Sequence, residues 1–352
     1  MSDSFSICCF LNKTTECATP PSPFATCDGI LYSWVLRLSA WIISVAAIVT
    51  NLMVLIGRWK AKLNATTAKP TENIFLANLA VADFLMGAYL LAIAIADASF
   101  GSDYFLYSKT WRTGTTCGII GVIGVLSSVV SLLDLTVMTI ERFICIVFPF
   151  GKIRLNPKWG KIICSIIWIF GFTVAILPTV SSDSLPNFYG YTDVCLGLPI
   201  VAIPQKVSKV VEKQGLLYQQ TGYTSEAMAT WKYSAILFTY LSSICLLIVT
   251  ICYVSIFVSV LKTRRSSHRA SGRKDEVKLA TRISIIVGTD MLCWLPLITL
   301  GVLSQCGIQI PSKVNPWLVV CVVPINSALN PFLYSHRILK KRKKNVPSYI
   351  QG

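Results

Sequence analysis

The stretch MTIERFICIVFPF, residues 138–150, decides the fold of this chain. It places two charged side chains, Glu141 and Arg142, inside an otherwise apolar run, where an ion is costly to bury. The whole chain has the same character, because 54% of its 352 residues are hydrophobic and 14% are charged, against about 25% charged in a soluble domain. This composition predicts an integral membrane protein and argues against a soluble one.

Seven apolar segments are long enough to cross a bilayer as helices, which takes about 20 residues each. They cover residues 34–57, 73–97, 115–148, 162–181, 233–260, 279–303 and 315–335. The sequence therefore predicts an all-α membrane protein, a bundle of seven transmembrane helices. The predicted parts are a head at 1–33, a membrane domain at 34–336 that includes a long second outer loop at 182–231, and a short basic tail at 337–352.

Lysine and arginine are concentrated on one side of the predicted bundle. Of the 32 basic residues, 21 lie in the three loops and the tail that share this side, where the only acidic residues are Glu72, Asp275 and Glu276. Positive charge favours the cytoplasmic side, so we expect the N-terminus outside and a multi-pass protein of the plasma membrane. The net charge of +16 then indicates contact with anionic lipid and a cytoplasmic partner rather than with nucleic acid.

The 13 cysteines divide between the outside and the spans. Those expected outside, where disulfides form, are Cys8, Cys9, Cys17, Cys27, Cys117 and Cys195, with Cys306 as a further candidate. We favour a bridge between Cys117 and Cys195, which would hold the second outer loop over the bundle. The four head cysteines can pair in three ways, and the sequence leaves that pairing open. Asn12, in the motif NKT, is an expected glycosylation site.

Polar residues inside the spans are expensive, which makes them candidates for function. They are Asn51, Asp83, Ser131, Asp134, Glu141, Arg142, Asp290, Asn326, Asn330 and Tyr334. No internal repeat or inverted pair of halves is visible, which favours a receptor over a transporter. No paired catalytic groups are visible either, so we expect no enzyme. A channel or transporter with Asp83, Asp134 and Asp290 along its path stays as the alternative.

Short motifs follow one another in a fixed order along the spans. They are TN at Asn51, LAVAD ending at Asp83, Cys117, ERF at Glu141, Trp168, Cys195, CWLP at 293–296 and NPFLY at 330–334. This ordered set resembles the rhodopsin-like G-protein-coupled receptors. The segments ERFICIVFPFGKIR, NFYGYTDVC, TDMLCWLPL and PINSALNPFLY resemble the relaxin receptors, within the leucine-rich-repeat-containing glycoprotein-hormone receptor group. Only about 33 residues precede the first span, too few for two such repeats, so we expect this ectodomain to be missing.

The resemblance implies a receptor that responds to a peptide or protein hormone, activates a heterotrimeric G protein and raises cAMP. In the inactive state Arg142 is expected to pair with Glu141 and with Glu276 at the inner end of span six. Once released, it would face the G protein. The other residues expected to take part in the switch are Tyr253, Trp294, Pro296, Pro331 and Tyr334, the two prolines because they kink their helices.

The resemblance also implies a polar core with a bound ion. Its residues match the family's sodium pocket and are Asn51, Asp83, Ser131, Asn326 and Asn330. Carboxylate, hydroxyl and amide oxygens suit a hard cation, but a protonated Asp83 in a water network would explain the same residues. The sequence leaves both open, and we expect no other cofactor.

Two further aspartates extend this core. Asp290 is expected to face Asn326 and Asn330 and so to hold spans six and seven together until activation. Asp134 departs from the group, which carries an uncharged residue there. It either bonds toward Trp168 on span four or alters basal activity, and the sequence does not choose between these roles.

Overall fold

The computed structural model describes residues 29–63, 70–148, 155–181, 185, 188–197, 207–213, 216–222, 225–266, 288, 293–306, 308 and 314–331. Several predicted residues lie outside this part of the chain, namely Asn12, the four head cysteines, Glu276, Asp290 and Tyr334. The expected contacts of Arg142 with Glu276, and of Asp290 with Asn326 and Asn330, therefore stay predictions.

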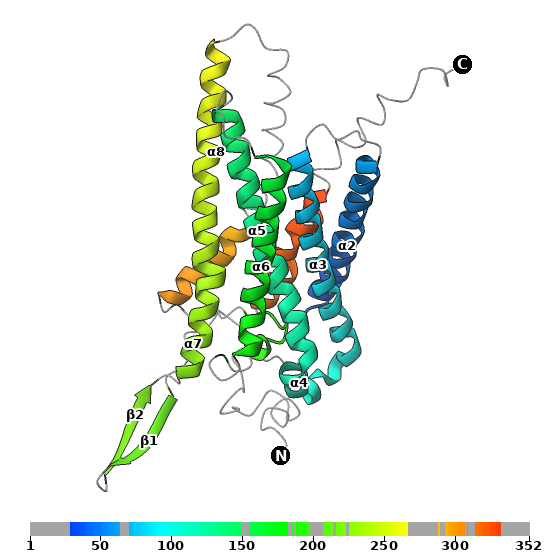
Figure 1. The fold of residues 1–352 in the computed structure, drawn as a ribbon. Helices are drawn as coiled ribbons and strands as arrows, with labels where there is room; N and C mark the ends of the chain where they lie inside the picture. The colour runs from blue at the N-terminus through cyan, green and yellow to red at the C-terminus, as the bar shows by residue number, and fades with distance from the viewer. Residues whose placement is uncertain are drawn as a thin grey trace.

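Every predicted span contains an apolar helix. The long helices are α2 (Trp34–Leu63), α3 (Pro70–Phe100), α5 (Thr115–Val147), α6 (Pro157–Val180) and a continuous unit of α7 (Ser225–Ser234), the π-helical η3 (Ala235–Tyr240) and α8 (Leu241–Ser266). Within the described residues, five helices are long and apolar enough to cross a membrane. Two shorter apolar helices, Cys293–Gln305 and Leu318–Pro331, cover parts of the sixth and seventh spans, the latter preceded by α10 (Val314–Trp317). The predicted seven-helix bundle is confirmed (Figure 1).

Helix α5 lies at the centre of the bundle. It packs against α3, α6 and α8, which surround it in Figure 1. Most of its length is apolar on every side, as expected of a helix enclosed by others. Its buried residues belong to two clusters, one in the outer half that includes Val125 and Val130 and one in the inner half that includes Leu135 and Met138.

Helices α6 and α7 begin more than one turn earlier than the apolar segments predicted. Helix α6 begins at Pro157, because the Asn156 side chain accepts a hydrogen bond from the Trp159 amide at 3.0 Å and caps the first turn. Helix α7 begins at Ser225, inside the segment predicted as the second outer loop. Capping and polar first turns carry no hydrophobic signal, so a search for apolar segments misses them.

The second outer loop contains strands that the sequence analysis did not predict. Strands β1 (Val207–Lys213) and β2 (Leu216–Gly222) form an antiparallel hairpin in which Val207 lies opposite Gly222. In Figure 1 the hairpin points away from the helices, beyond α7. Water can solvate its two open edges there, which the hydrocarbon core could not do. The bundle is all-α as predicted, and the hairpin is an addition outside the membrane.

Candidate functional site

At the inner end of α5, Arg142 is buried between two carboxylates. Its Nη2 lies 3.0 Å from Glu72 Oε2 and its Nε lies 3.1 Å from Glu141 Oε2. The three side chains are only 7%, 9% and 12% exposed, in the order Arg142, Glu72, Glu141. Within the described residues, α3 and α5 itself thus supply two carboxylates that neutralise the arginine.

Glu72 is the partner that the sequence analysis missed. It lies in the first turn of α3, where the exposed N–H groups of the helix favour an acidic side chain. The same turn is fixed to the second inner loop, because the Thr71 hydroxyl donates to the Leu155 carbonyl at 3.1 Å. The only signal of this pairing in the sequence was that Glu72 is one of the few acidic residues on the inner side. Tyr253 of α8 also reaches this cluster, since its hydroxyl interacts with Thr139 and with the charge of Arg142.

The middle of the bundle holds a second polar cluster, built around Asp83 of α3. The Asp83 carboxylate accepts hydrogen bonds from Ser131 Oγ at 3.3 Å, Ser327 Oγ at 3.0 Å and Asn330 Nδ2 at 2.9 Å. Asn51 of α2 donates to the Ser327 carbonyl at 2.8 Å. Three spans thus meet at one buried carboxylate, and α2 joins them through the Ser327 carbonyl.

The structure assigns this cluster slightly different members from those predicted. Ser327, not its neighbour Asn326, donates to Asp83, although Asn326 is also buried. The π-helical segment η4 (Leu318–Val322) precedes these residues, and its wider turn changes which side of the helix faces inward. Sequence motifs do not reveal such a change of helical phase. Among the described residues, the Oδ1 atom of Asn51 is buried here without a hydrogen-bond partner.

A third cluster joins α3, α5 and α6 through Asn78. The Asn78 side chain donates from Nδ2 to Asp134 Oδ1 at 2.9 Å, and its Oδ1 accepts from Trp168 Nε1 at 2.6 Å. Asp134 therefore bonds to α3, and it is linked to Trp168 of span four only indirectly, through Asn78.

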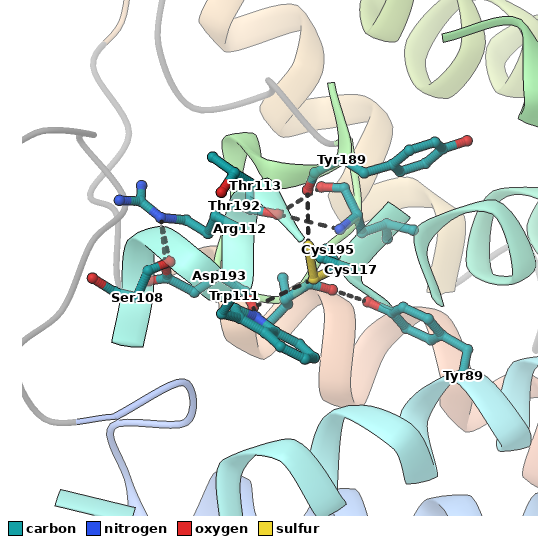
Figure 2. Close-up of a disulfide and its surroundings, with 12 residues drawn as sticks. Tyr89, Ser108, Trp111, Arg112, Thr113, Cys117, Tyr189, Thr192, Asp193 and Cys195 are labelled. Atoms are coloured by element: carbon teal, nitrogen blue, oxygen red, sulfur yellow. Dashed lines mark hydrogen bonds and ion pairs between the residues drawn. A yellow bond between two sulfur atoms is a disulfide. The ribbon is translucent and has the colours of Figure 1, made fainter. Parts of the chain in front are cut away.

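At the outer end, the predicted disulfide between Cys117 and Cys195 is present (Figure 2). It connects the first turn of α5 to the second outer loop. Two aromatic side chains hold the loop residues just before the bridge: Tyr89 donates to the Val194 carbonyl at 2.7 Å, and Trp111 Nε1 donates to the Asp193 carbonyl at 2.8 Å. The loop is thereby fixed to both α3 and α4 (Tyr104–Thr113).

The buried Asp193 side chain is a further contact between this loop and α4. Tyr104 donates its hydroxyl to Asp193 Oδ1 at 2.8 Å, and Arg112 Nε lies 3.6 Å from the same oxygen. Leu196 and Tyr189 continue the loop into the outer end of the bundle, where they are 1% and 4% exposed. The loop thus fills the outer end with the protein's own side chains.

Comparison with known proteins identifies the family to which this arrangement belongs. Residues 50–334 match the family described as "7 transmembrane receptor (rhodopsin family)". The chain belongs to this receptor family. The match runs from the TN motif at Asn51 to the end of NPFLY, so it includes the inner part of the first span and the six spans that follow.

Several known receptors are similar to this receptor. It is 32% identical over 333 residues to the G-protein coupled receptor GRL101 of Lymnaea stagnalis, covering 95% of this chain and 27% of that protein. It is 31% identical over 335 residues to human relaxin receptor 2, and 30% identical over 321 residues to the follicle-stimulating hormone receptor of Cairina moschata. Those matches cover 94% and 91% of this chain and 41% of each relative. The receptor is a multi-pass protein of the plasma membrane, and its family is one of receptors rather than enzymes.

The remaining predicted switch residues of the receptor lie in the sixth and seventh spans. Trp294 is 8% exposed and packs in the outer cluster with Leu297. Pro296 lies two residues further along the helix Cys293–Gln305, and Pro331 is the last described residue of the seventh span.

Proposed function

We propose that this chain is a G-protein-coupled receptor that senses an extracellular peptide or protein hormone and promotes nucleotide exchange on a heterotrimeric G protein. The observation that carries the proposal is the buried arginine of the inner end, Arg142, with its two carboxylate partners. The names of the relatives, relaxin receptor and follicle-stimulating hormone receptor, support a hormone of this class. The outer end filled by Leu196 and Tyr189 supports a ligand that acts on the loops.

The inner cluster has the energetics of a switch. Separating one partner from a buried ion pair costs about 3–5 kcal/mol, because the other charge is left uncompensated. Arg142 therefore favours the helix packing in which Glu72 and Glu141 both reach it. When the inner half opens, the guanidinium can leave these carboxylates and bind the G protein, which replaces the lost contacts. The bound G protein and the closed bundle then compete for the same side chain.

The test is nucleotide exchange with the full chain in lipid nanodiscs and a panel of purified Gα classes with Gβγ. We expect exchange above that of empty nanodiscs for at least one class, and its loss in Arg142→Ala, because the side chain that binds the G protein is gone. A response from the class that stimulates adenylyl cyclase would support the predicted rise in cAMP. Ion flux through proteoliposomes, without exchange on any class, would instead favour a channel or transporter.

We also infer that the Asp83 cluster holds a sodium ion. The atoms that would bind the ion are all oxygens, which suits a hard cation. They belong to the Asp83 carboxylate, the Ser131 and Ser327 hydroxyls and Asn51 Oδ1, which has no hydrogen-bond partner among the described residues. Asn330 presents its amide nitrogen to Asp83 and would orient the carboxylate rather than bind the ion.

Sodium is therefore expected to raise the melting temperature of the purified receptor relative to an equal concentration of potassium. A ligand that binds the folded state alone stabilises it by mass action. Asp83→Asn removes the negative charge and should abolish the difference, whereas Asp103→Asn, an exposed acid at the outer surface, should retain it. Equal melting temperatures of the unmodified receptor in both salts would favour the alternative of a protonated Asp83 among waters.

A further inference from the structure

Asp134 is a buried carboxyl group with almost no polar support. Its side chain lies in the middle of α5 and is 0% exposed. Within the described part of the chain, its Oδ1 accepts one hydrogen bond, from Asn78, and its Oδ2 has no partner. A carboxylate anion has about four acceptor sites, so an ionised Asp134 would be left largely unsolvated.

The neighbouring Asp83 is a buried acid in the same bundle that accepts more hydrogen bonds than Asp134. Asp83 is equally buried, but three donors on α5 and the seventh span reach its two oxygens. Ser131, one of these donors, lies one turn before Asp134 on α5. Helix α5 therefore directs the Ser131 hydroxyl to Asp83. Among the described residues, Asp134 accepts a hydrogen bond from the Asn78 amide alone.

Among the described residues, the side chains that face Asp134 offer no compensating positive charge. From α3 and α6 the titratable neighbours are Asp83 and the Cys164 thiol, which both interact electrostatically with it. Helix α8 contributes Val249 to the inner apolar cluster beside Asp134. Its Tyr253 interacts with Thr139 and Arg142 and not with Asp134. Arg142 itself, two turns further along α5, is already paired with Glu72 and Glu141. While no cation is bound at Asp83, a second negative charge beside it would be repelled, and burial without a counter-ion of its own drives a carboxyl group to its neutral form.

We propose that Asp134 is a proton-binding site at the junction of α3, α5 and α6, and that its carboxyl group is protonated in the closed bundle. The neutral acid keeps the hydrogen bond from Asn78, because its carbonyl oxygen still accepts. If the inner half opens as the proposed function requires, water can reach Asp134 and the proton is released. Opening would then be favoured as pH rises, by at most about tenfold per pH unit for a single proton.

Infrared spectroscopy of the receptor in nanodiscs tests the site without any G protein. A protonated carboxylic acid has its own C=O stretching band, which shifts in heavy water. We expect Asp134→Asn to remove such a band and Asp83→Asn to leave it in place. Asn78→Ala keeps Asp134 but removes the one donor that the described residues give it, so it should move the band to higher frequency. This second variant tests the assignment even if Asp134→Asn folds poorly.

Two results would overturn the proposal. One is a spectrum of folded Asp134→Asn that has the same carboxylic-acid bands as the unmodified receptor. The other is an Asn78→Ala spectrum with no shift in any such band. The coupling to opening rests on the proposed function and is tested separately, by the pH dependence of basal nucleotide exchange, which should become shallower in Asp134→Asn. An unchanged pH profile beside a lost infrared band would overturn the coupling and retain the proton site.

Discussion

Glu72→Gln is expected to raise the basal G-protein activation of this receptor strongly. The substitution removes one of the two carboxylates that hold Arg142, at a contact of 3.0 Å, while Glu141 remains. Losing one of two partners should shift the balance between closed and open packing by about 1–2 kcal/mol, which corresponds to about a 5- to 30-fold change in the population ratio. The measurement is basal nucleotide exchange in cells or nanodiscs at matched receptor amounts.

The matched controls separate this effect from general destabilisation. Glu72→Asp keeps the charge on a shorter side chain and should raise basal activity less than Glu72→Gln. The double variant Glu72→Gln with Arg142→Ala should be silent, because the arginine that binds the G protein is missing. If Glu72→Gln has the basal activity of the unmodified receptor, Glu141 and other contacts set the position of Arg142, and the first turn of α3 does not restrain the switch.

Gly121→Ala is expected to destabilise the outer end of the receptor, although alanine is normally the better helix residue. A Cβ atom at this position would overlap with the Tyr189 ring and lie 2.5 Å from the Cys195 carbonyl oxygen. The second outer loop is fixed there by the disulfide and cannot move away easily. Overpacking of this kind costs about 1–3 kcal/mol, which should appear as a lower melting temperature of the purified receptor.

Gly118→Ala is the matched control, one turn earlier on the same helix. Nothing lies within 4 Å of the Cβ atom that this substitution would add. Alanine is favoured over glycine inside a helix by about 1 kcal/mol, so this variant should be as stable as the unmodified receptor or more stable. If both variants melt at the same temperature, the loop does not pack against α5 as closely as the structure shows.

Predictions from sequence succeeded where the signal is local. A run of apolar residues must form a helix in hydrocarbon, because every backbone N–H and C=O has to be satisfied within the segment. The seven spans follow from such local signals, with the ordered motifs adding the family, and the order of the spans placed Cys117 and Cys195 on the same outer side. The early starts of α6 and α7 and the strands of the second outer loop lacked this signal, since water solvates the backbone there.

Partners between spans could not be predicted from the sequence in the same way. Glu72 and Arg142 are charged residues on different helices, and no local pattern states that the first turn of α3 lies beside the last turns of α5. Ser327 faces Asp83 across 244 residues of sequence, after a π-helical turn that shifts its helix by a fraction of a turn. Asn78 joins Asp134 to Trp168 only because three helices cross at that depth.

The sequence by itself determined which segments enter the membrane, on which side of it the N-terminus lies, and which polar residues inside the spans are candidates for function. These follow from the cost of placing each residue in water or in hydrocarbon. Only the tertiary structure decided that Glu72 joins Glu141 in neutralising Arg142, which hydroxyls support Asp83, and that Asp134 has one donor among the described residues. Those contacts depend on how far each helix is rotated about its axis and on its depth in the membrane. Rotating a helix by one residue position exchanges one polar partner for another and changes the buried hydrophobic area little.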